Sequence, residues 1–283
     1  MNLDESLIRV LACPRCHGPL EIGPTRMACR AVGCGYTGRI DDDVLLFANP
    51  GAGSFFDDRT QAMDRIVHDV GTRALFYERQ SEAAHRYLAG APVILDVGCG
   101  GGLQYPRPSG SRVIGVDLSR ELLRENKGLD AALYASAAEL PVADRLVDRV
   151  VCFYAVHHFV GGSVAENRSL VERAFSEFGR VLRPQGELLV FDLSPWWPAW
   201  RAQCAVWNCA RRALGSRLDM FFWRAGALEA IATRRLGRPA RASREVFRGQ
   251  LSKVIPAGVG LAWLRVPRAL YPFQICLYRW RVA

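Results

Sequence analysis

Short apolar runs and one helix-spaced stretch organise the middle of this chain. Val93–Leu95 and Val113–Val116 are apolar runs that predict buried strands, and Arg149–Tyr154 predicts another. Between residues 168 and 182 the apolar side chains recur instead at helical spacing, namely at Leu170, Val171, Ala174, Phe175, Phe178 and Val181. Strands that alternate with helices predict an α/β protein with a parallel sheet.

The residues that follow the first two strands indicate a nucleoside site. The first strand runs into Asp96-Val-Gly98-Cys99-Gly100-Gly-Gly102, and the second is followed by Asp117. Glycine has no Cβ, so its backbone can turn sharply and approach a ligand closely. A carboxylate at Asp117 can accept both hydroxyl hydrogens of a ribose. The same order of strand, glycine turn, helix, strand and acid binds a nucleoside in dinucleotide-binding folds.

The spacing of the glycines favours one kind of ligand. The nicotinamide and flavin fingerprint is Gly-x-Gly-x-x-Gly, with the pyrophosphate at a helix N-terminus. Here the order is Asp-x-Gly-x-Gly-x-Gly, with Asp96 two residues before the first glycine. An acid at that position repels a pyrophosphate but suits the ammonium group of an amino acid. S-Adenosylmethionine carries both an ammonium group and a ribose, so it is the expected cofactor.

With these residues the chain resembles the class I S-adenosylmethionine-dependent methyltransferases, whose first motif reads like Leu95–Gly100. Further motifs follow in the family's order: Ala135–Val142 after the third strand, Val147–Val150 before the fourth strand, and Ala155–Phe159 at its end. Arg180–Phe191 resembles the helix–turn–strand unit of the fifth strand, with Pro-Gln-Gly in place of Pro-Gly-Gly. The resemblance covers residues 55–195.

The resemblance implies a cofactor site and two candidate bases. The cofactor-binding residues would be Asp96, Gly98, Cys99, Gly100, Gly102, Asp117, Leu118, Ser136, Ala137 and Tyr154. Ser136 stands where the family has the Asp that meets the adenine amino group, and a hydroxyl lacks the charge assistance of a carboxylate. Backbone groups around Ala137 are therefore expected to share adenine recognition.

His157 and His158 are the candidate catalytic residues. They follow the fourth strand, at the sheet edge where ligands bind in open α/β folds, and an imidazole can remove a proton near neutral pH. In the alternative interpretation, one histidine packs against the following helix and the other only orients the loop.

Two cysteine pairs near the N-terminus predict a metal site. Cys13 and Cys16 form the first pair, and Cys29 and Cys34 form the second, each with glycine or proline nearby. Four thiolates in paired turns suit a closed, structural Zn²⁺ site. A Cys-x-x-Cys redox motif requires a βαβ setting that this segment lacks. A second alternative is a ribbon that keeps its fold without metal, because the four-residue second spacing is looser than usual.

Leu7–Leu20 resembles the small zinc-ribbon proteins that bind and stabilise methyltransferases, and Tyr36–Leu46 is a partial match to the end of that family. The resemblance implies that such a ribbon is fused here to a methyltransferase. Residues 1–50 are then a zinc-ribbon domain, too small to be stable on a core alone. Residues 51–283 are the methyltransferase domain, after a Gly/Pro-rich linker at residues 48–54.

Composition limits what else the chain can be. At 283 residues it has room for two such domains. No apolar stretch approaches the ~20 uninterrupted residues of a transmembrane helix. The start of the chain does not read as a signal peptide, and the remaining cysteines show no disulfide framework. We therefore expect a reduced, cytoplasmic protein.

The last third of the chain is basic and rich in tryptophan. Residues 201–283 contain sixteen Lys/Arg against three Asp/Glu, and all seven tryptophans lie at or beyond Trp196. Such a basic patch is suited to nucleic acid, anionic lipid or an acidic substrate. The alternative interpretation is a general preference for Arg along the whole chain, since 35 of the 37 basic residues are Arg. Residues 195–248 are expected to form a helical insert on the substrate side. Such helices line an apolar pocket, lie on a membrane surface, stack on unpaired bases or simply cover the domain.

These features together predict a doubly wound, Rossmann-like α/β methyltransferase with an N-terminal zinc ribbon and an aromatic-rich insert after the fifth strand. The expected reaction is methyl transfer to a small lipophilic or aromatic metabolite at O, N or C, with Trp196, Trp197 and Trp223 facing the acceptor. The alternative is an rRNA or tRNA base methyltransferase whose ribbon recognises RNA. The chain has Tyr154-Ala-Val-His157 where enzymes that methylate exocyclic amines of nucleic acid have Asn-Pro-Pro-Tyr, which disfavours that reaction. The presence of Asp96 and Asp117 disfavours a non-catalytic scaffold that has lost cofactor binding.

Overall fold

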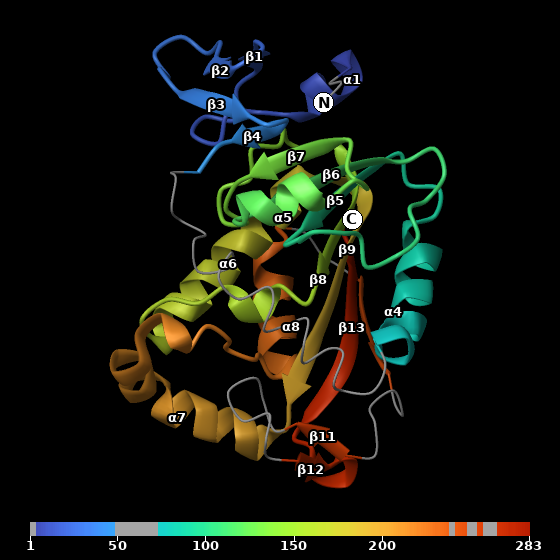
Figure 1. The fold of residues 1–283 in the computed structure, drawn as a ribbon, viewed down its shortest axis with the longest axis vertical. Helices are drawn as coiled ribbons and strands as arrows, with labels where there is room; N and C mark the ends of the chain where they lie inside the picture. Colours follow the sequence, from blue (N-terminus) through green and yellow to red (C-terminus); the bar gives the residue numbers. More distant parts are fainter. Residues whose placement is uncertain (1–3, 49–72, 238–240, 248–253, 257–264) are drawn as a thin grey trace.

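A computed structural model describes residues 4–48, 73–237, 241–247, 254–256 and 265–283. These residues form one eleven-stranded sheet with helices against it (Figure 1). In spatial order its strands are β1 (Leu20–Ile22), β2 (Arg26–Cys29), β3 (Thr37–Asp41), β4 (Val44–Leu46), β7 (Ala131–Tyr134), β6 (Arg112–Asp117), β5 (Val93–Val97), β8 (Val147–Phe153), β9 (Leu182–Pro195), β13 (Phe273–Arg281) and β10 (Arg241–Val246). A separate hairpin pairs β11 (Val254–Pro256) with β12 (Arg265–Pro267).

The helices fall between these strands in the chain. They are α1 (Glu5–Val10), α4 (Arg73–Leu88), α5 (Arg120–Glu125), α6 (Val164–Val181), α7 (Trp197–Leu214) and α8 (Ala225–Arg235), with short 3₁₀ turns η1 (Val156–His158), η2 (Gly215–Arg217) and η4 (Arg268–Leu270). The predicted α/β class is confirmed, because β7, β6, β5, β8 and β9 are mutually parallel. The chain steps outward from β5 in one direction and then, from β8, in the other. Ligands bind at such a switch point, beyond the carboxyl ends of the strands.

Apolar side chains cover both faces of this sheet, as they must when helices pack on each side. Along β5, Leu95 belongs to the core shared with α6 and α8, whereas Ile94 belongs to the core shared with α4. The same alternation places Val150 with the first core and Val151 with the second. This double burial explains why these strands read as continuous apolar runs.

Helix α6 confirms the predicted helical stretch and begins four residues earlier than the apolar pattern. Its first turn is capped by Ser163, whose Oγ accepts a hydrogen bond from the Glu166 amide at 3.2 Å. Val171, Phe175 and four further residues of the inner face are buried. The cap lies outside the apolar period, which is why the period alone places the start too late.

The N-terminal segment extends the central sheet. Strand β4 pairs parallel with β7, so β1–β4 continue the sheet beyond β7 (Figure 1). The Ala12 amide donates to the Pro141 carbonyl at 3.0 Å, and the Ala143 amide donates to the Val10 carbonyl at 2.8 Å. Leu7 is buried in the same core as α6. The predicted domain boundary at residue 50 lies outside the described residues.

The insert after β9 is helical only in its first part. Helices α7 and α8 occupy it as expected, but residues 241–246 form β10, which pairs antiparallel with β13. Pairing with a neighbouring strand satisfies the backbone of a segment that lacks an apolar helical face. The expectation that Trp196 and Trp197 face inwards is wrong, because they are 43% and 54% exposed. Trp223 is 6% exposed, but it is packed in the core shared with α6 and does not line the pocket described below. No helix among the described residues has the length and hydropathy required to cross a bilayer.

Candidate cofactor and metal sites

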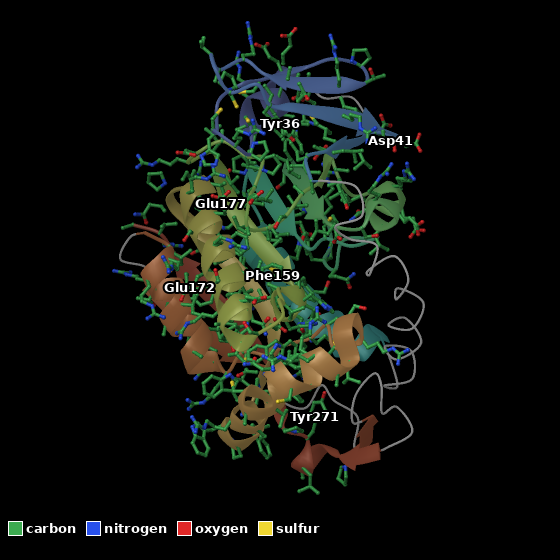
Figure 2. The ribbon with its side chains drawn as sticks, turned by 90° about the vertical axis from the view of Figure 1, so that its left-hand side faces the viewer. Tyr36, Asp41, Phe159, Glu172, Glu177 and Tyr271 are labelled. Atoms are coloured by element: carbon green, nitrogen blue, oxygen red, sulfur yellow. The ribbon has the colours of Figure 1, made fainter. Side chains whose placement is uncertain are left out.

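A pocket of about 430 Å³ opens beyond the carboxyl ends of β5, β6 and β8. Its size is within the range of small-molecule sites. Eight of the predicted site residues line it: Gly98, Gly100, Asp117, Leu118, Ser136, Ala137, Tyr154 and His158. Phe159 also lines the pocket. Figure 2 shows it near the middle of the molecule, between Tyr36 of the N-terminal segment and Tyr271 near the opposite end.

The glycine turn after β5 has glycines where side chains would obstruct it. Gly98 has φ +72°, and a Cβ there would lie 2.3 Å from the Cβ of Ala155, so this residue must be small for the turn to pack on the end of β8. Gly100 has φ +56°, and a Cβ there would meet no atom within 4 Å. Gly100 also lines the pocket, so its backbone is open to close approach by a ligand.

Asp117 connects the glycine turn to the end of β6. Its Oδ2 accepts a hydrogen bond from the Gly100 amide and its Oδ1 accepts one from the Ser119 amide, both at 2.9 Å. Ser119 in turn caps α5 through its own Oγ. Each carboxylate oxygen can accept more than one hydrogen bond. Asp117 can therefore hold the turn and also accept hydroxyl hydrogens from a ligand.

Asp96 lies inside the protein beneath the turn, 2% exposed. Its Oδ2 accepts a hydrogen bond from the Tyr105 hydroxyl at 2.8 Å, while its Oδ1 has no hydrogen-bond partner in the described part of the chain. Burial raises the pKa of Asp96 to about 7. A buried carboxylate with an unsatisfied oxygen is suited to a cationic ligand group. Tyr105 carries no motif, so sequence reasoning did not identify it.

Other predicted cofactor residues lie around the pocket rather than in its wall. Cys99 is buried, and burial raises the pKa of its thiol well above the usual range, which excludes a thiolate nucleophile here. The Gly102 carbonyl accepts a hydrogen bond from the side-chain amide of Gln104 at 3.1 Å.

Ser136 lies in the pocket wall. Its Oγ accepts a hydrogen bond from the Ala138 backbone amide at 3.2 Å, which holds the Ser136–Ala138 turn in shape.

Tyr154 is held in an unusual backbone conformation, with φ +55°. Its hydroxyl donates to Oε1 of Gln80 at 2.6 Å, and Gln80 is fully buried on α4. A non-glycine residue with positive φ is uncommon outside constrained turns and sites. The helix before the first motif thus positions a pocket residue through Gln80, which no sequence pattern identified.

The two histidines have different surroundings. His157 is 4% exposed and does not line the pocket. Its Nδ1 lies 2.7 Å from Oδ1 of Asp192, its amide donates to Oδ2 of the same residue at 3.1 Å, and its ring stacks on Phe222. These contacts join the end of β8 to β9, which is a structural role.

His158 lines the pocket. Its Nδ1 lies 3.1 Å from the main-chain carbonyl oxygen of Asp219, which can only accept a hydrogen bond. When the ring is neutral, this contact places its hydrogen on Nδ1, and Nε2 is then the basic nitrogen. Asp219 lies between η2 and α8, and its contact with His158 was not predicted from the sequence.

The outer part of the pocket is largely apolar. Phe159, Val160, Leu170 and Ala174 line it, together with Arg211 from α7 and Asp219. The Arg211 guanidinium donates from Nη1 to the carbonyls of Gly215 and Leu218 at 2.5 and 2.6 Å, which satisfies the end of α7.

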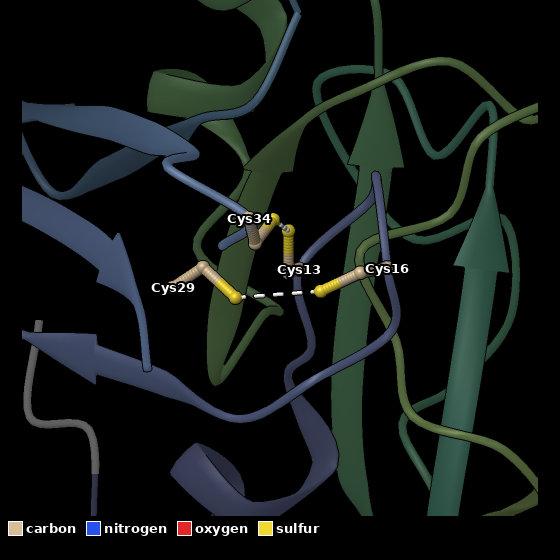
Figure 3. Close-up of side chains that lie close together, drawn as sticks. All are labelled: Cys13, Cys16, Cys29 and Cys34. Atoms are coloured by element: carbon tan, nitrogen blue, oxygen red, sulfur yellow. Dashed lines mark hydrogen bonds between the residues drawn. The ribbon is translucent and has the colours of Figure 1, made fainter. Parts of the chain in front are cut away.

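The four predicted cysteine ligands come together in the N-terminal segment (Figure 3). Their Sγ atoms all lie within 4.8 Å of one another, with Cys13–Cys34 at 3.7 Å and Cys16–Cys29 at 3.4 Å. Tetrahedral Zn–S bonds of about 2.3 Å place sulfur atoms about 3.8 Å apart, so the cluster has the dimensions of a Cys₄ zinc site. The amides of Gly18 and Ala31 donate to the sulfurs of Cys16 and Cys29. The cluster therefore fits Zn²⁺ in both donor type and spacing.

Comparison with known proteins assigns the central part of the chain. Residues 95–190 match the family model of a methyltransferase domain. The chain is 34% identical over 158 residues to a ubiquinone/menaquinone biosynthesis C-methyltransferase of Syntrophotalea carbinolica, a match that covers 48% of this chain and 62% of that protein. It is 32% identical over 105 residues to an Arabidopsis thaliana tRNA (carboxymethyluridine(34)-5-O)-methyltransferase, covering 36% of this chain and 24% of that protein. The chain thus spans less than two thirds of either relative.

A solved structure shows the same fold. It is the complex between the Haloferax volcanii Trm112 methyltransferase activator and a putative methyltransferase, and its matching chain superposes with a TM-score of 0.52 at 15% identity, covering 82% of this chain and 98% of that one. Residues 95–190 therefore match a methyltransferase domain, and the sheet around them has the Rossmann-like α/β fold of methyltransferases.

We expect the buried carboxyl of Asp96 to make stability depend on pH. Its pKa of about 7 exceeds the value of about 3.9 in an unfolded chain, so between those pH values the folded state binds more protons and stability falls as pH rises. Asp96→Asn keeps a side-chain oxygen that can accept the Tyr105 hydrogen bond, and it removes the loss of stability that ionisation causes. Urea unfolding should show the variant gaining stability relative to the unsubstituted protein between pH 5 and pH 8.

Glu139→Gln, which removes an exposed carboxylate, is the control and should show no such gain. A stability difference between the Asp96 variant and the unsubstituted protein that stays constant across this pH range would contradict the assignment.

Proposed function

We propose that the chain is an S-adenosylmethionine-dependent methyltransferase that acts on a small lipophilic or aromatic acceptor. The observation that carries the proposal is the pair of carboxylates at the glycine turn. Asp96, buried with an orphaned oxygen, and Asp117, in the pocket wall, lie on either side of Gly98 and Gly100. A nucleoside that carries an ammonium group matches both.

The proposed cofactor contacts follow the residues around the pocket. Asp96 receives the ammonium group, Asp117 the ribose hydroxyls, and the backbone around Ser136 and Ala137 the adenine. Bound S-adenosylmethionine supplies a methyl group on a sulfonium for in-line displacement. The protein then has to align the acceptor with that methyl and exclude water. Tyr154, held by Gln80, forms part of the wall that does so.

The outer pocket favours an apolar acceptor because Phe159, Val160 and Leu170 line it. His158 is proposed as the base for an acceptor whose proton must be removed, through Nε2. His157, predicted as an alternative base, is proposed instead to position its neighbour: it is tied to Asp192, and its ring centroid lies 4.3 Å from that of His158.

RNA is the second candidate acceptor, because one of the relatives is named a tRNA methyltransferase. Trp207 and Trp223, two of the aromatic side chains of the insert, are buried and cannot stack on bases, whereas Trp196 and Trp197 are exposed. The apolar lining of the pocket by Phe159, Val160 and Leu170 supports a small lipophilic acceptor more than RNA.

The ribbon is proposed to bind one structural Zn²⁺ through Cys13, Cys16, Cys29 and Cys34. All four positions are protein ligands, so the metal has no open coordination site for catalysis. The ribbon then resembles a methyltransferase partner supplied in the same chain. The similarly folded Haloferax volcanii protein forms a complex with a separate activator, Trm112.

Asp117→Ala should weaken S-adenosylmethionine binding by a factor of ten or more, because hydrogen bonds to a charged group contribute roughly 1.5–3 kcal/mol each. Calorimetric titration measures the affinity, and transfer of labelled methyl into an organic extract measures the reaction. Asp43→Ala, an exposed acid in the β3–β4 turn, is the matched control. Unchanged affinity in the Asp117 variant would remove this residue from the site, and labelled methyl found in RNA alone would overturn the small-molecule acceptor.

His158→Gln should lower kcat about 10²–10⁴-fold, the usual contribution of a general base, and leave cofactor affinity unchanged. The pH profile of kcat should lose its acidic limb in this variant. His157→Gln should instead lower thermal stability, because it disturbs the buried contact with Asp192. If both variants keep full kcat, the acceptor needs no protein base.

Metal analysis should find one zinc per chain, because a single Cys₄ cluster is present among the described residues. Cys16→Ser should lose the metal and lower the unfolding temperature, whereas Cys209→Ser, an exposed cysteine outside the cluster, should do neither. An unfolding temperature that is the same with and without metal would show that packing alone holds the ribbon.

A further inference from the structure

Exposed apolar side chains concentrate at one end of the molecule. Seven large ones are prominent among the described residues: Val32, Leu146, Trp196, Trp197, Val206, Leu214 and Leu270. Five of the seven lie on α7, directly before it, or on η4. The Trp196 amide donates to the Pro272 carbonyl at 2.8 Å, so the start of α7 adjoins the segment after η4. Both views show α7 towards the end of the molecule opposite the ribbon (Figures 1 and 2).

Helix α7 has one face against the protein and one face towards solvent. Trp207, 2% exposed, marks the inner face. The exposed residues of the helix are Trp197, Pro198, Arg201, Ala202, Ala205, Val206, Asn208, Cys209, Arg212, Ala213 and Leu214. This outer face combines apolar side chains with arginines and contains no acid.

The charge of this region has a single sign. Residues 193–218 contain four arginines and no Asp or Glu. The Arg201 guanidinium lies over the Trp197 ring, 5.9 Å from its centroid, and Arg212 is exposed. Arginines beside an exposed tryptophan and aliphatic side chains match an anionic headgroup layer above acyl chains.

We propose that this outer face docks on an anionic lipid membrane. We call it the interfacial face and define it as Trp196, Trp197, Arg201, Val206 and Arg212. A membrane accounts for all five side chains, since the apolar ones enter the headgroup–acyl boundary and the arginines meet lipid phosphates. Nucleic acid would use the arginines and stack on the tryptophans but leave Val206 without a role.

The interfacial face continues into the pocket wall. Arg211, one residue before Arg212, lines the pocket, and so does Ser216 in the turn after α7. This part of the inference rests on the proposed function: a lipophilic acceptor dissolved in the membrane would reach the pocket along α7 without crossing water.

The test is cosedimentation of the full chain with vesicles of phosphatidylcholine, with and without phosphatidylglycerol. Binding should require the anionic lipid and weaken as salt is added. Trp197→Ala combined with Val206→Ala should lower the partition coefficient about tenfold, and Arg212→Gln about fivefold. Val32→Ala and Arg26→Gln remove exposed side chains from the N-terminal segment and should change nothing.

The proposal would be overturned if the protein did not bind anionic vesicles at low salt, or if the two control variants lost as much vesicle binding as the α7 variants. It would also be overturned if RNA displaced the protein from the vesicles and substitution of Val206 had no effect on binding. Cofactor affinity measured without lipid separates this proposal from the proposed function. A chain that binds S-adenosylmethionine and transfers methyl but ignores vesicles refutes only the membrane face. A chain that binds vesicles without binding cofactor refutes only the methyltransferase proposal.

Discussion

The pocket depends on the hydrogen bond from the Gly100 amide to Asp117. This bond fixes the turn after β5 against the end of β6, and Gly98 fixes the same turn against the end of β8 by its lack of a side chain. The carboxylate that shapes the turn also lines the pocket and is the one proposed to bind the ribose. Loop shape and ligand recognition therefore cannot be separated by substitution at Asp117 alone.

Asp96 adds a constraint of a different kind. A buried carboxylate with one unsatisfied oxygen is costly when ionised, which is why its pKa lies near 7. A cationic ligand group offsets that cost. The site thus contains an unfavourable interaction that a ligand of the correct charge relieves, while Tyr105 keeps the carboxyl oriented.

The N-terminal segment also contacts the strand that leads to the pocket. The amides of Phe47 and Ala48, just after β4, both donate to the Tyr134 carbonyl, at 2.9 and 3.0 Å. Tyr134 ends β7, two residues before Ser136 in the pocket wall. A metal that orders the cysteine cluster would therefore also steady the strand that leads into the proposed adenine side of the site.

The sequence alone determined the elements whose signals are local. Continuous apolar runs predict strands such as β5 because both of their faces are buried. The turn at Gly98 and Gly100 is readable because both residues have positive φ, which glycine adopts without steric cost. The paired cysteines are equally local, since two short turns already bring each pair of ligands together.

Only the tertiary structure decided the remainder, because it depends on contacts between distant segments. Gln80 meets Tyr154 across 74 positions, and Asp219 meets His158 across 61. Neither pairing leaves a periodic or motif signal. The burial of Trp223 and the exposure of Trp197 were likewise undetermined by their residue type, since both are aromatic side chains in one insert. Trp223, just before α8, joins the main core, whereas Trp197 lies at the exposed start of α7, so the packing of each segment decided which of them meets solvent.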